Sequence, residues 1–346
     1  MFKFNAGAMH PATGDARLAA ANDLVTRTLA RNGITTGGLP SALPGMTMPD
    51  LSRWTGAPVR PGAVAHGMNA STFACTAGSR DYLLHVPEKA KDGATGLIVM
   101  LHGCTQTPAD FAAGTAMNAL ADRDGFIVLY PGQSRGDNAQ SCWNWFSRGD
   151  QLRDKGEPAI LAGMTRQIAA SHGIAADRTF VAGLSAGAAM AVILGQTHGD
   201  VFAAVGAHSG LPYAAARDVP SAFAAMGGQG ADVAPAGPGV PTIVFHGTAD
   251  ATVAPVNGTR IAAHALHGVA QSIETEATGT TAGRGWHLRT AADMRGHVLL
   301  EHWTVEGLGH AWSGGQPGGS YTDAKGPDAS AEMVRFFFDN AGKATS

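Results

Sequence analysis

The segment Gly183–Gly187 reads G-L-S-A-G and fits the G-x-S-x-G pattern of a nucleophilic serine. The apolar run Phe180–Ala182 precedes it, and the helix-forming run Ala188–Leu194 follows it. On such a strand–turn–helix corner, flanking glycines keep side chains away from the neighbouring backbone. The helix would also direct its first N–H groups toward developing negative charge. The pattern therefore predicts Ser185 as the nucleophile of an acyl-transfer reaction.

A serine hydroxyl needs a base to take its proton and an acid to orient that base. With this type of nucleophile the chain order is Ser, acid, His. Asp250 follows the apolar run Thr242–Phe245, and His310 follows the strand-like segment that ends at Val305. Both positions lie at the carboxyl ends of expected strands, where ligands gather in open α/β sheets. We therefore predict Asp250 as the acid and His310 as the base.

Other candidates for these two roles fit the pattern less well. Only His310 comes late in the chain, after a strand and between glycines. Asp232 lies in a Gly/Pro loop without a preceding strand, and Asp293 has no apolar run before it. The other histidines near strand ends are His102, His208 and His246.

Two backbone N–H groups are needed to hold the oxyanion of an acyl-transfer intermediate. We expect one from Ala186, directly after the nucleophile, and one from Cys104, in the loop after Leu97–Leu101. Gly103 would let that loop approach the substrate closely. We expect His102 to contact substrate or to order this loop, and not to act as a second base.

Aromatic residues suggest where the organic part of an ester would bind. Trp143 opens the W-N-W-F cluster, which lies in an irregular loop after the Pro131-Gly132 turn, and Trp312 lies two residues after His310. Together they predict an apolar wall for the acyl or alcohol group. The alternative is that Trp145 and Phe146 plug the core beneath the loop.

The elements around these residues alternate between buried strands and helices. Such alternation predicts an α/β fold with a mostly parallel sheet covered on both faces. The expected strands cover residues 82–86, 97–101, 126–130, 179–182, 242–245 and 298–304. The expected helices cover residues 109–122, 158–172, 186–198 and 329–341.

Composition excludes several classes of protein. Of the 346 residues 45% are hydrophobic, and 24 Lys and Arg against 27 Asp and Glu give a net charge of -3, which disfavours nucleic-acid binding. No apolar run is long enough for a membrane span. No C-x-x-C motif, helical His-x-x-x-His pair or Gly-rich phosphate loop is present, so we expect neither a metal nor a nucleotide cofactor. We expect His264 and His267, on a helical stretch, to be ordinary surface residues.

Three cysteines leave at least one thiol unpaired within a monomer. Cys104 and Cys142 both lie in loops expected on the catalytic face, whereas Cys75 lies in an early strand-like stretch. A Cys104–Cys142 disulfide would pin the oxyanion loop. Against it, residues 1–11 show no signal peptide, which favours a cytoplasmic location with reduced thiols. The sequence leaves both states of this pair open.

The N-terminal region differs in texture from the rest of the chain. Residues 15–31 form an apolar helical stripe, and residues 33–67 are rich in Gly, Pro and Met and read as a linker. We therefore expect an N-terminal helix plus linker over residues 1–69 and a catalytic domain over residues 70–346. The helix would dock on its own or a neighbouring protein body, or attach to a lipid or polymer surface.

Over roughly residues 70–340 the chain resembles the poly(3-hydroxybutyrate) depolymerase family of esterases, relatives of feruloyl and acetylxylan esterases. The resemblance implies an α/β-hydrolase fold and ester hydrolysis through Ser185, Asp250 and His310. It also implies an oxyanion hole near Cys104 and Ala186. The motifs that carry it are Leu101–Gln106, Tyr130–Gln133, Cys142–Phe146, Gly183–Met190, His208–Tyr213, His246–Asp250, Gly307–Gly315 and Tyr321–Asp323.

The substrate class remains open between related esters. A hydroxyalkanoate polymer or oligomer is the first expectation, and a soluble feruloyl or acetyl ester of plant polysaccharide is the second. Secreted polymer depolymerases carry a signal peptide and a separate substrate-binding domain, and we recognise neither in this sequence. From another class, the chain would be a non-catalytic granule- or partner-binding protein that acts through residues 15–31.

Overall fold

The computed structural model describes residues 67–342, apart from residues 236 and 238. The helix expected over residues 15–31 and nearly all of the expected linker lie outside this part of the chain. Within the described residues the first strand begins at Met68. Within the described residues, no helix combines the length and apolar character needed to cross a membrane.

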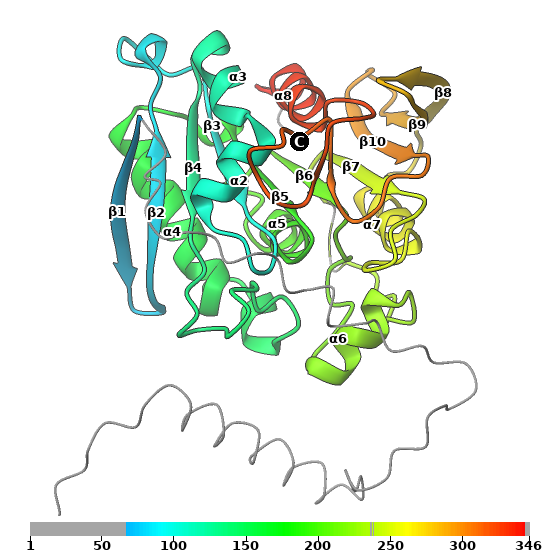
Figure 1. Ribbon diagram of the computed structural model, residues 1–346, viewed down its shortest axis with the longest axis horizontal. Helices are drawn as coiled ribbons and strands as arrows, with labels where there is room; N and C mark the ends of the chain where they lie inside the picture. Colours follow the sequence, from blue (N-terminus) through cyan, green and yellow to red (C-terminus); the bar gives the residue numbers. More distant parts are fainter. Residues whose placement is uncertain (1–66, 236, 238, 343–346) are drawn as a thin grey trace, which may run out of the picture. The chain divides into compact units, whose positions relative to one another are not determined.

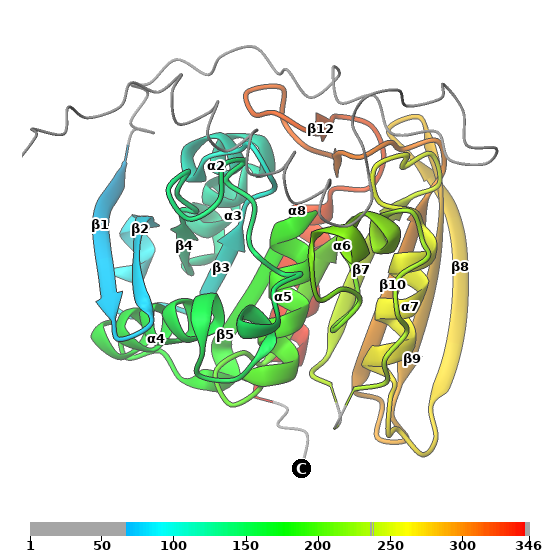
Figure 2. The same ribbon diagram turned by 90° about the horizontal axis from the view of Figure 1, so that it is seen from below.

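A ten-stranded sheet runs through the described part of the chain in the order β1-β2-β4-β3-β5-β6-β7-β10-β9-β8 (Figure 1). The strands from β4 to β10 in this order are parallel, whereas antiparallel pairs close both edges, at β1 and β8 (Figure 2). The strands are β1 Met68–Cys75, β2 Gly78–His85, β3 Leu97–Leu101, β4 Ile127–Pro131, β5 Thr179–Leu184, β6 Ala204–His208, β7 Thr242–Gly247, β8 Ile273–Thr281, β9 Arg284–Ala292 and β10 Val298–Val305.

Helices cover both faces of the sheet, so the central strands are buried on both sides (Figure 1). One face packs under α4, α5 and α7, and the other under α2, α3 and α8. The helices are α2 Pro108–Thr115, α3 Met117–Asp124, α4 Gly156–Ser171, α5 Ala186–Thr197, α6 Val219–Met226, α7 Val256–Ala265 and α8 Ala329–Asn340. Two further strands of two residues each, β11 Trp312–Ser313 and β12 Thr322–Asp323, pair with each other in parallel.

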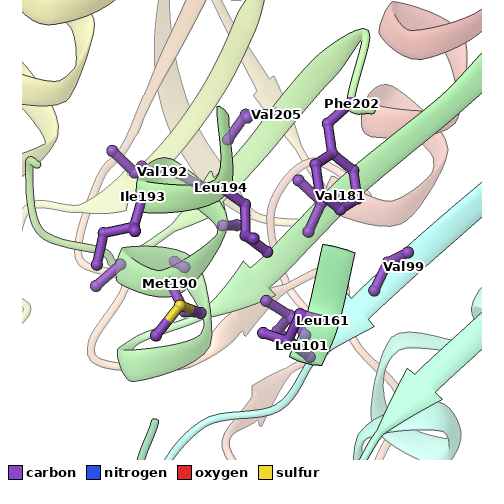
Figure 3. Packing of buried hydrophobic residues seen from close by; sticks show 14 of the residues in the cluster. Val99, Leu101, Leu161, Val181, Met190, Val192, Ile193, Leu194, Phe202 and Val205 are labelled. Carbon is purple, nitrogen blue, oxygen red and sulfur yellow. The ribbon is translucent and has the colours of Figure 1, made fainter. Parts of the chain in front are cut away.

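Successive side chains of each central strand enter opposite core clusters, because side chains alternate along a strand. Leu101 and Val181 pack with Leu161 and Met190 beneath α4 and α5, as Figure 3 shows. The neighbouring Phe180 packs with α8, where its ring stacks on Phe337. Packing on both faces holds the central strands in place, and with them the loops at their carboxyl ends that carry the candidate site residues.

Two expectations about the elements need correction. The single helix over residues 109–122 is two helices, because Ala116 takes a left-handed conformation at φ 51° and ends α2. The hairpin β8–β9 was not expected, because β8 is polar and exposed along nearly all of its length. An exposed strand lacks the apolar run that marks a buried one.

Candidate active site

Ser185 lies on the corner between β5 and α5, with φ 57° and ψ −119°. Neither neighbouring glycine has room for a side chain. A Cβ at Gly187 would come within 2.0 Å of Leu101 O, and a Cβ at Gly183 within 2.4 Å of the Gly187 carbonyl carbon. The strained corner is held by Ser185 N–H, which donates to His208 O at 2.9 Å. This geometry places Ser185 just beyond the carboxyl end of β5, where it is 9% exposed.

Asp250 and His310, from the loops after β7 and β10, meet in the structure. His310 Nδ1 lies 2.8 Å from Asp250 Oδ2, and both side chains are largely buried. Asp250 Oδ1 accepts hydrogen bonds of 2.9 Å each from the N–H groups of Thr252 and Val253, which orients the carboxylate. A donor at Nδ1 leaves Nε2 of the imidazole as the acceptor, the tautomer that a base for a serine needs.

The environment of Asp250 favours its charged form. Burial on its own raises the pKa of this carboxyl, but the hydrogen bond and charge of His310, with help from Val253 N–H, outweigh it and lower the pKa to about 2. His246 Nε2 also lies 3.5 Å from Asp250 Oδ2. Among the described residues no hydrogen bond joins Ser185 Oγ to His310, a contact that often tightens only with substrate bound.

The loop after β3 comes close to the nucleophile. A Cβ added at Gly103 would lie 3.7 Å from Ser185 Cβ. Gly103 N–H donates to Gln106 Oε1 at 2.8 Å, so this N–H is already occupied. Within the described part of the chain, the N–H groups of Cys104 and Ala186 have no hydrogen-bond acceptor. Both are therefore available to an oxyanion, as the oxyanion-hole prediction requires.

His102 orders this loop. Its ring is fully buried, its Nδ1 lies 2.8 Å from Gly103 O, and its Nε2 accepts from Gln133 N–H at 3.1 Å. Burial outweighs these contacts and lowers the pKa of His102 to about 4, so the ring is neutral near pH 7. Of the two roles expected for His102, the structure supports loop ordering and offers no surface for substrate contact.

The aromatic wall expected from Trp143 and Trp312 is not present, because both side chains belong to the core. Trp143 is 0% and Trp312 1% exposed. The indole of Trp143 donates to His102 O at 3.1 Å, and that of Trp312 donates to Ser330 Oγ at 3.0 Å. Trp145 is buried too, as the core alternative anticipated, and Phe146 meets it edge to face. Trp143 therefore contacts the oxyanion loop through His102 and does not line a surface for substrate.

Of the two states that the sequence leaves open for Cys104 and Cys142, the structure has the disulfide. Cys75 is free and exposed. The bond ties the oxyanion loop to the irregular loop that carries Trp143. That second loop makes another contact at Gln140 O, which accepts from Thr105 N–H at 2.7 Å.

His208 is a site residue whose role the sequence did not reveal. It lies at the end of β6, its ring is buried, and its Nε2 accepts from Ser313 N–H at 3.0 Å. It stacks on Trp312, with ring centroids 5.0 Å apart. The side chain of His208 thus holds the loop that bears His310, while its carbonyl holds Ser185. Its position near a strand end was the available signal, but nothing in the sequence pairs it with Ser313.

The expectation for His264 was wrong, whereas His267 is exposed as expected. His264 is 7% exposed, and its Nε2 lies 2.8 Å from Asp232 Oδ1. This pair joins α7 to the loop after α6. Among the described residues, no group of three or more His, Cys, Asp or Glu side chains is arranged to hold a metal ion.

Comparison with known proteins gives a consistent picture of the family. The family described as "Esterase PHB depolymerase" matches residues 80–285, a segment that includes Ser185 and Asp250 and ends before His310. The chain is 35% identical over 256 residues to poly(3-hydroxyalkanoate) depolymerase C of Paucimonas lemoignei, covering 69% of this chain and 60% of that protein. It is 29% identical over 253 residues to poly(3-hydroxybutyrate) depolymerase of Ralstonia pickettii, covering 67% of this chain and 51% of that protein.

Solved structures place the fold. An acetyl xylan esterase from Aspergillus awamori superposes with a TM-score of 0.58 at 19% identity, over 75% of this chain and 94% of that one. The described residues thus adopt the α/β-hydrolase fold, with the expected parallel sheet between two layers of helices. The chain spans only about half to three fifths of the two depolymerases named above.

Proposed function

The chain belongs to the PHB depolymerase family of esterases, and from this membership we propose that it hydrolyses carboxylic esters through an acyl-enzyme on Ser185. The observation that carries the proposal is the 2.8 Å contact between His310 Nδ1 and Asp250 Oδ2. It joins the loops after β7 and β10, which leave the same carboxyl edge of the parallel strands as the corner that bears Ser185. Because Nδ1 of His310 faces Asp250, Nε2 is left to accept the proton of the serine.

In the proposed reaction, His310 Nε2 takes the proton of Ser185 Oγ as the oxygen attacks the ester carbonyl carbon. Asp250 stabilises the resulting imidazolium, and the N–H groups of Ala186 and Cys104 hold the negative oxygen. Collapse of this intermediate breaks the bond to the alcohol, which leaves with the proton from His310. Water then attacks the acyl-enzyme by the same route, releasing the acid and restoring Ser185.

For the substrate we propose a hydroxyalkanoate polymer or oligomer. The relatives matched over two thirds of this chain are named as depolymerases of poly(3-hydroxyalkanoate) and poly(3-hydroxybutyrate). A feruloyl or acetylxylan ester is the second candidate. It is favoured by a shorter match, 31% identical over 131 residues, to feruloyl esterase B of Neurospora crassa.

The test compares the chain and its Ser185→Ala variant on short acyl esters, hydroxybutyrate oligomers, polymer films and methyl ferulate. We expect turnover of oligomers to exceed that of methyl ferulate and to disappear in Ser185→Ala. If Ser185→Ala turned over these esters as fast as the wild-type chain, the proposed mechanism through Ser185 would be refuted. Turnover of methyl ferulate alone would move the substrate to the second candidate, and ester binding without turnover by either protein would favour a non-catalytic binding role.

We also propose that residues 15–31 attach the protein to a polymer surface or to a partner. The apolar stripe in the sequence supports this proposal. Deletion of residues 1–60 is expected to lower retention on polymer films while leaving hydrolysis of soluble esters intact. Full retention by the shortened chain would contradict the attachment role.

A further inference from the structure

Glu157 is a buried carboxylate to which the proposed mechanism gives no role. It lies in the first turn of α4 and is 3% exposed. Its Oε2 accepts from Asn144 N–H at 2.7 Å. Its Oε1 accepts from Asn144 Nδ2 at 2.8 Å, from Arg80 Nη2 at 3.3 Å and from Gln133 Nε2. The carboxylate therefore gathers four donors, three of which come from one loop.

That loop, residues 133–144, is called here the bracing loop. Its other side contacts the oxyanion loop, residues 102–106, at four points. One is covalent, the disulfide from Cys142 to Cys104. The other three are hydrogen bonds: Thr105 N–H to Gln140 O at 2.7 Å, Gln133 N–H to His102 Nε2 at 3.1 Å, and Trp143 Nε1 to His102 O at 3.1 Å.

We infer that Glu157 is a positioning residue for the oxyanion hole, because its carboxylate holds the bracing loop that in turn sets the Cys104 N–H. The inference rests on the proposed function. Gln133 and Asn144 make the chain of contacts continuous. Gln133 donates to Glu157 from its side chain and to His102 from its backbone, so that any shift of the loop at Glu157 is passed to His102 and its neighbours.

The chemistry of the contact requires a charged carboxylate. A carboxylate only accepts hydrogen bonds, and all four partners are donors. A protonated acid or an amide would turn a donor of its own toward one of them, so at least one contact to the bracing loop would be lost. Buried donors without acceptors are costly, and the loop would move to regain partners.

Charged groups surround Glu157 from each element packed against it. Arg80 of β2 contacts it and also pairs with Asp137 of the bracing loop, with Nη1 and Oδ2 3.0 Å apart. Asp150, before α4, accepts from Glu157 N–H at 2.7 Å. Burial and then the charge of Asp150 raise the pKa of Glu157 to about 7, against the opposing contacts of Asn144, Gln133 and Arg80. The bracing contact is therefore complete only at higher pH.

The decisive variant is Glu157→Gln, compared with Glu301→Gln as a matched control. Glu301 is also a buried carboxylate, 4% exposed, and pairs with Arg335 at 2.6 Å on the β10–α8 side, where none of its contacts reaches the oxyanion loop. Loss of one oxyanion donor lowers kcat by roughly 100-fold or more, so a displaced donor is expected to lower it by about 10-fold. We expect this loss in Glu157→Gln at about pH 8.5, with KM changed less than about twofold, because the oxyanion forms only after binding.

The pH profile separates positioning from a general loss of stability. The difference in kcat between wild type and Glu157→Gln should close toward about pH 6, where wild-type Glu157 is itself protonated. Glu301→Gln should keep the wild-type profile. A kcat ratio that does not change with pH, a normal kcat at high pH, or a raised KM with unchanged kcat would each overturn the inference.

Two further measurements keep the outcome decisive if Glu157→Gln folds poorly or if the ester activity is absent. Asn144→Ala removes a half-buried side-chain donor and should reproduce part of the loss in kcat. Amide hydrogen exchange of residues 102–106 and 133–144 should be faster in Glu157→Gln and Asn144→Ala than in Glu301→Gln. Unchanged exchange would refute the brace whatever the activity, whereas faster exchange in a chain without Ser185-dependent turnover would refute only the proposed function.

Discussion

Removal of the Cys104–Cys142 disulfide should weaken both stability and catalysis. The bonded residues are 38 positions apart. Closing a loop of that length lowers the entropy of the unfolded chain enough to stabilise the fold by about 4 kcal/mol at 25 °C in the chain-entropy model. The double variant Cys104→Ser/Cys142→Ser should therefore unfold at a urea concentration about 1–2 M lower than wild type, for a slope of roughly 3 kcal/mol/M.

The catalytic effect is separable from the loss of stability. Cys104 supplies a proposed oxyanion donor, and Thr105 and His102 remain bound to the bracing loop without the disulfide. We therefore expect kcat to fall by about 10-fold with little change in KM, measured in buffer where both proteins are folded. Cys75→Ser is the control, since Cys75 is exposed and unpaired.

Counting thiols in denaturant without reductant tests the premise directly. Of the three cysteines only Cys75 should react in wild type. Three reactive thiols would show that the bond does not form. An unchanged urea midpoint for the double variant, in a protein with one reactive thiol, would refute the entropic reasoning instead.

Three other perturbations have outcomes fixed by the geometry. Asp250→Asn should lower kcat by about 10⁴-fold with the fold intact, because the amide favours the wrong tautomer of His310; a loss below 10-fold would contradict the assigned role. Gly187→Ala places a Cβ 2.0 Å from Leu101 O and should cost about 1–3 kcal/mol of unfolding free energy together with activity; a wild-type melting temperature would contradict the packing. From about pH 6 to pH 5, His102 and His208, with pKa values lowered by burial to about 4 and about 3, stay neutral when folded but take up protons when unfolded. Glu157 opposes this by one proton because its pKa is raised, so these three groups together should lower the free energy of unfolding by about 1.4 kcal/mol per pH unit. Burial lowers the pKa of His302 to about 4 as well, which adds to the fall. A urea midpoint that is constant or rises toward pH 5 would contradict this prediction.

The central strands could be predicted from the sequence because burial on both faces leaves an unbroken apolar run. The structure has β3 over Leu97–Leu101 as expected and β7 over Thr242–Gly247, two residues longer. The edge hairpin β8–β9 and the helix break at Ala116 could not be predicted. Polar edge strands lack the hydrophobic signal, and a left-handed alanine is stabilised by surroundings that the sequence does not display.

In the candidate site, the sequence located those residues that can be recognised from their immediate neighbours in the chain. Ser185 has its flanking glycines, and Asp250 and His310 each follow a strand. The burial of Trp143 and Trp312 could not be predicted, because a tryptophan in a loop reads the same whether it faces substrate or core. Glu157 and His208 depend on partners far away in the chain, and a single sequence does not pair distant residues.

The order of strands in the sheet has a consequence for how activity is regained after denaturation. Ser185 follows β5, whereas His310 follows β10, which joins the sheet by pairing with β7 from Leu300 opposite Thr242. The hairpin β8–β9 closes locally, but β10 must meet a strand far back in the chain, and such non-local pairings form slowly. A refolding chain can therefore regain most of its secondary structure while it is still inactive. The rate at which ester turnover recovers then reports the rate at which β10 pairs with β7.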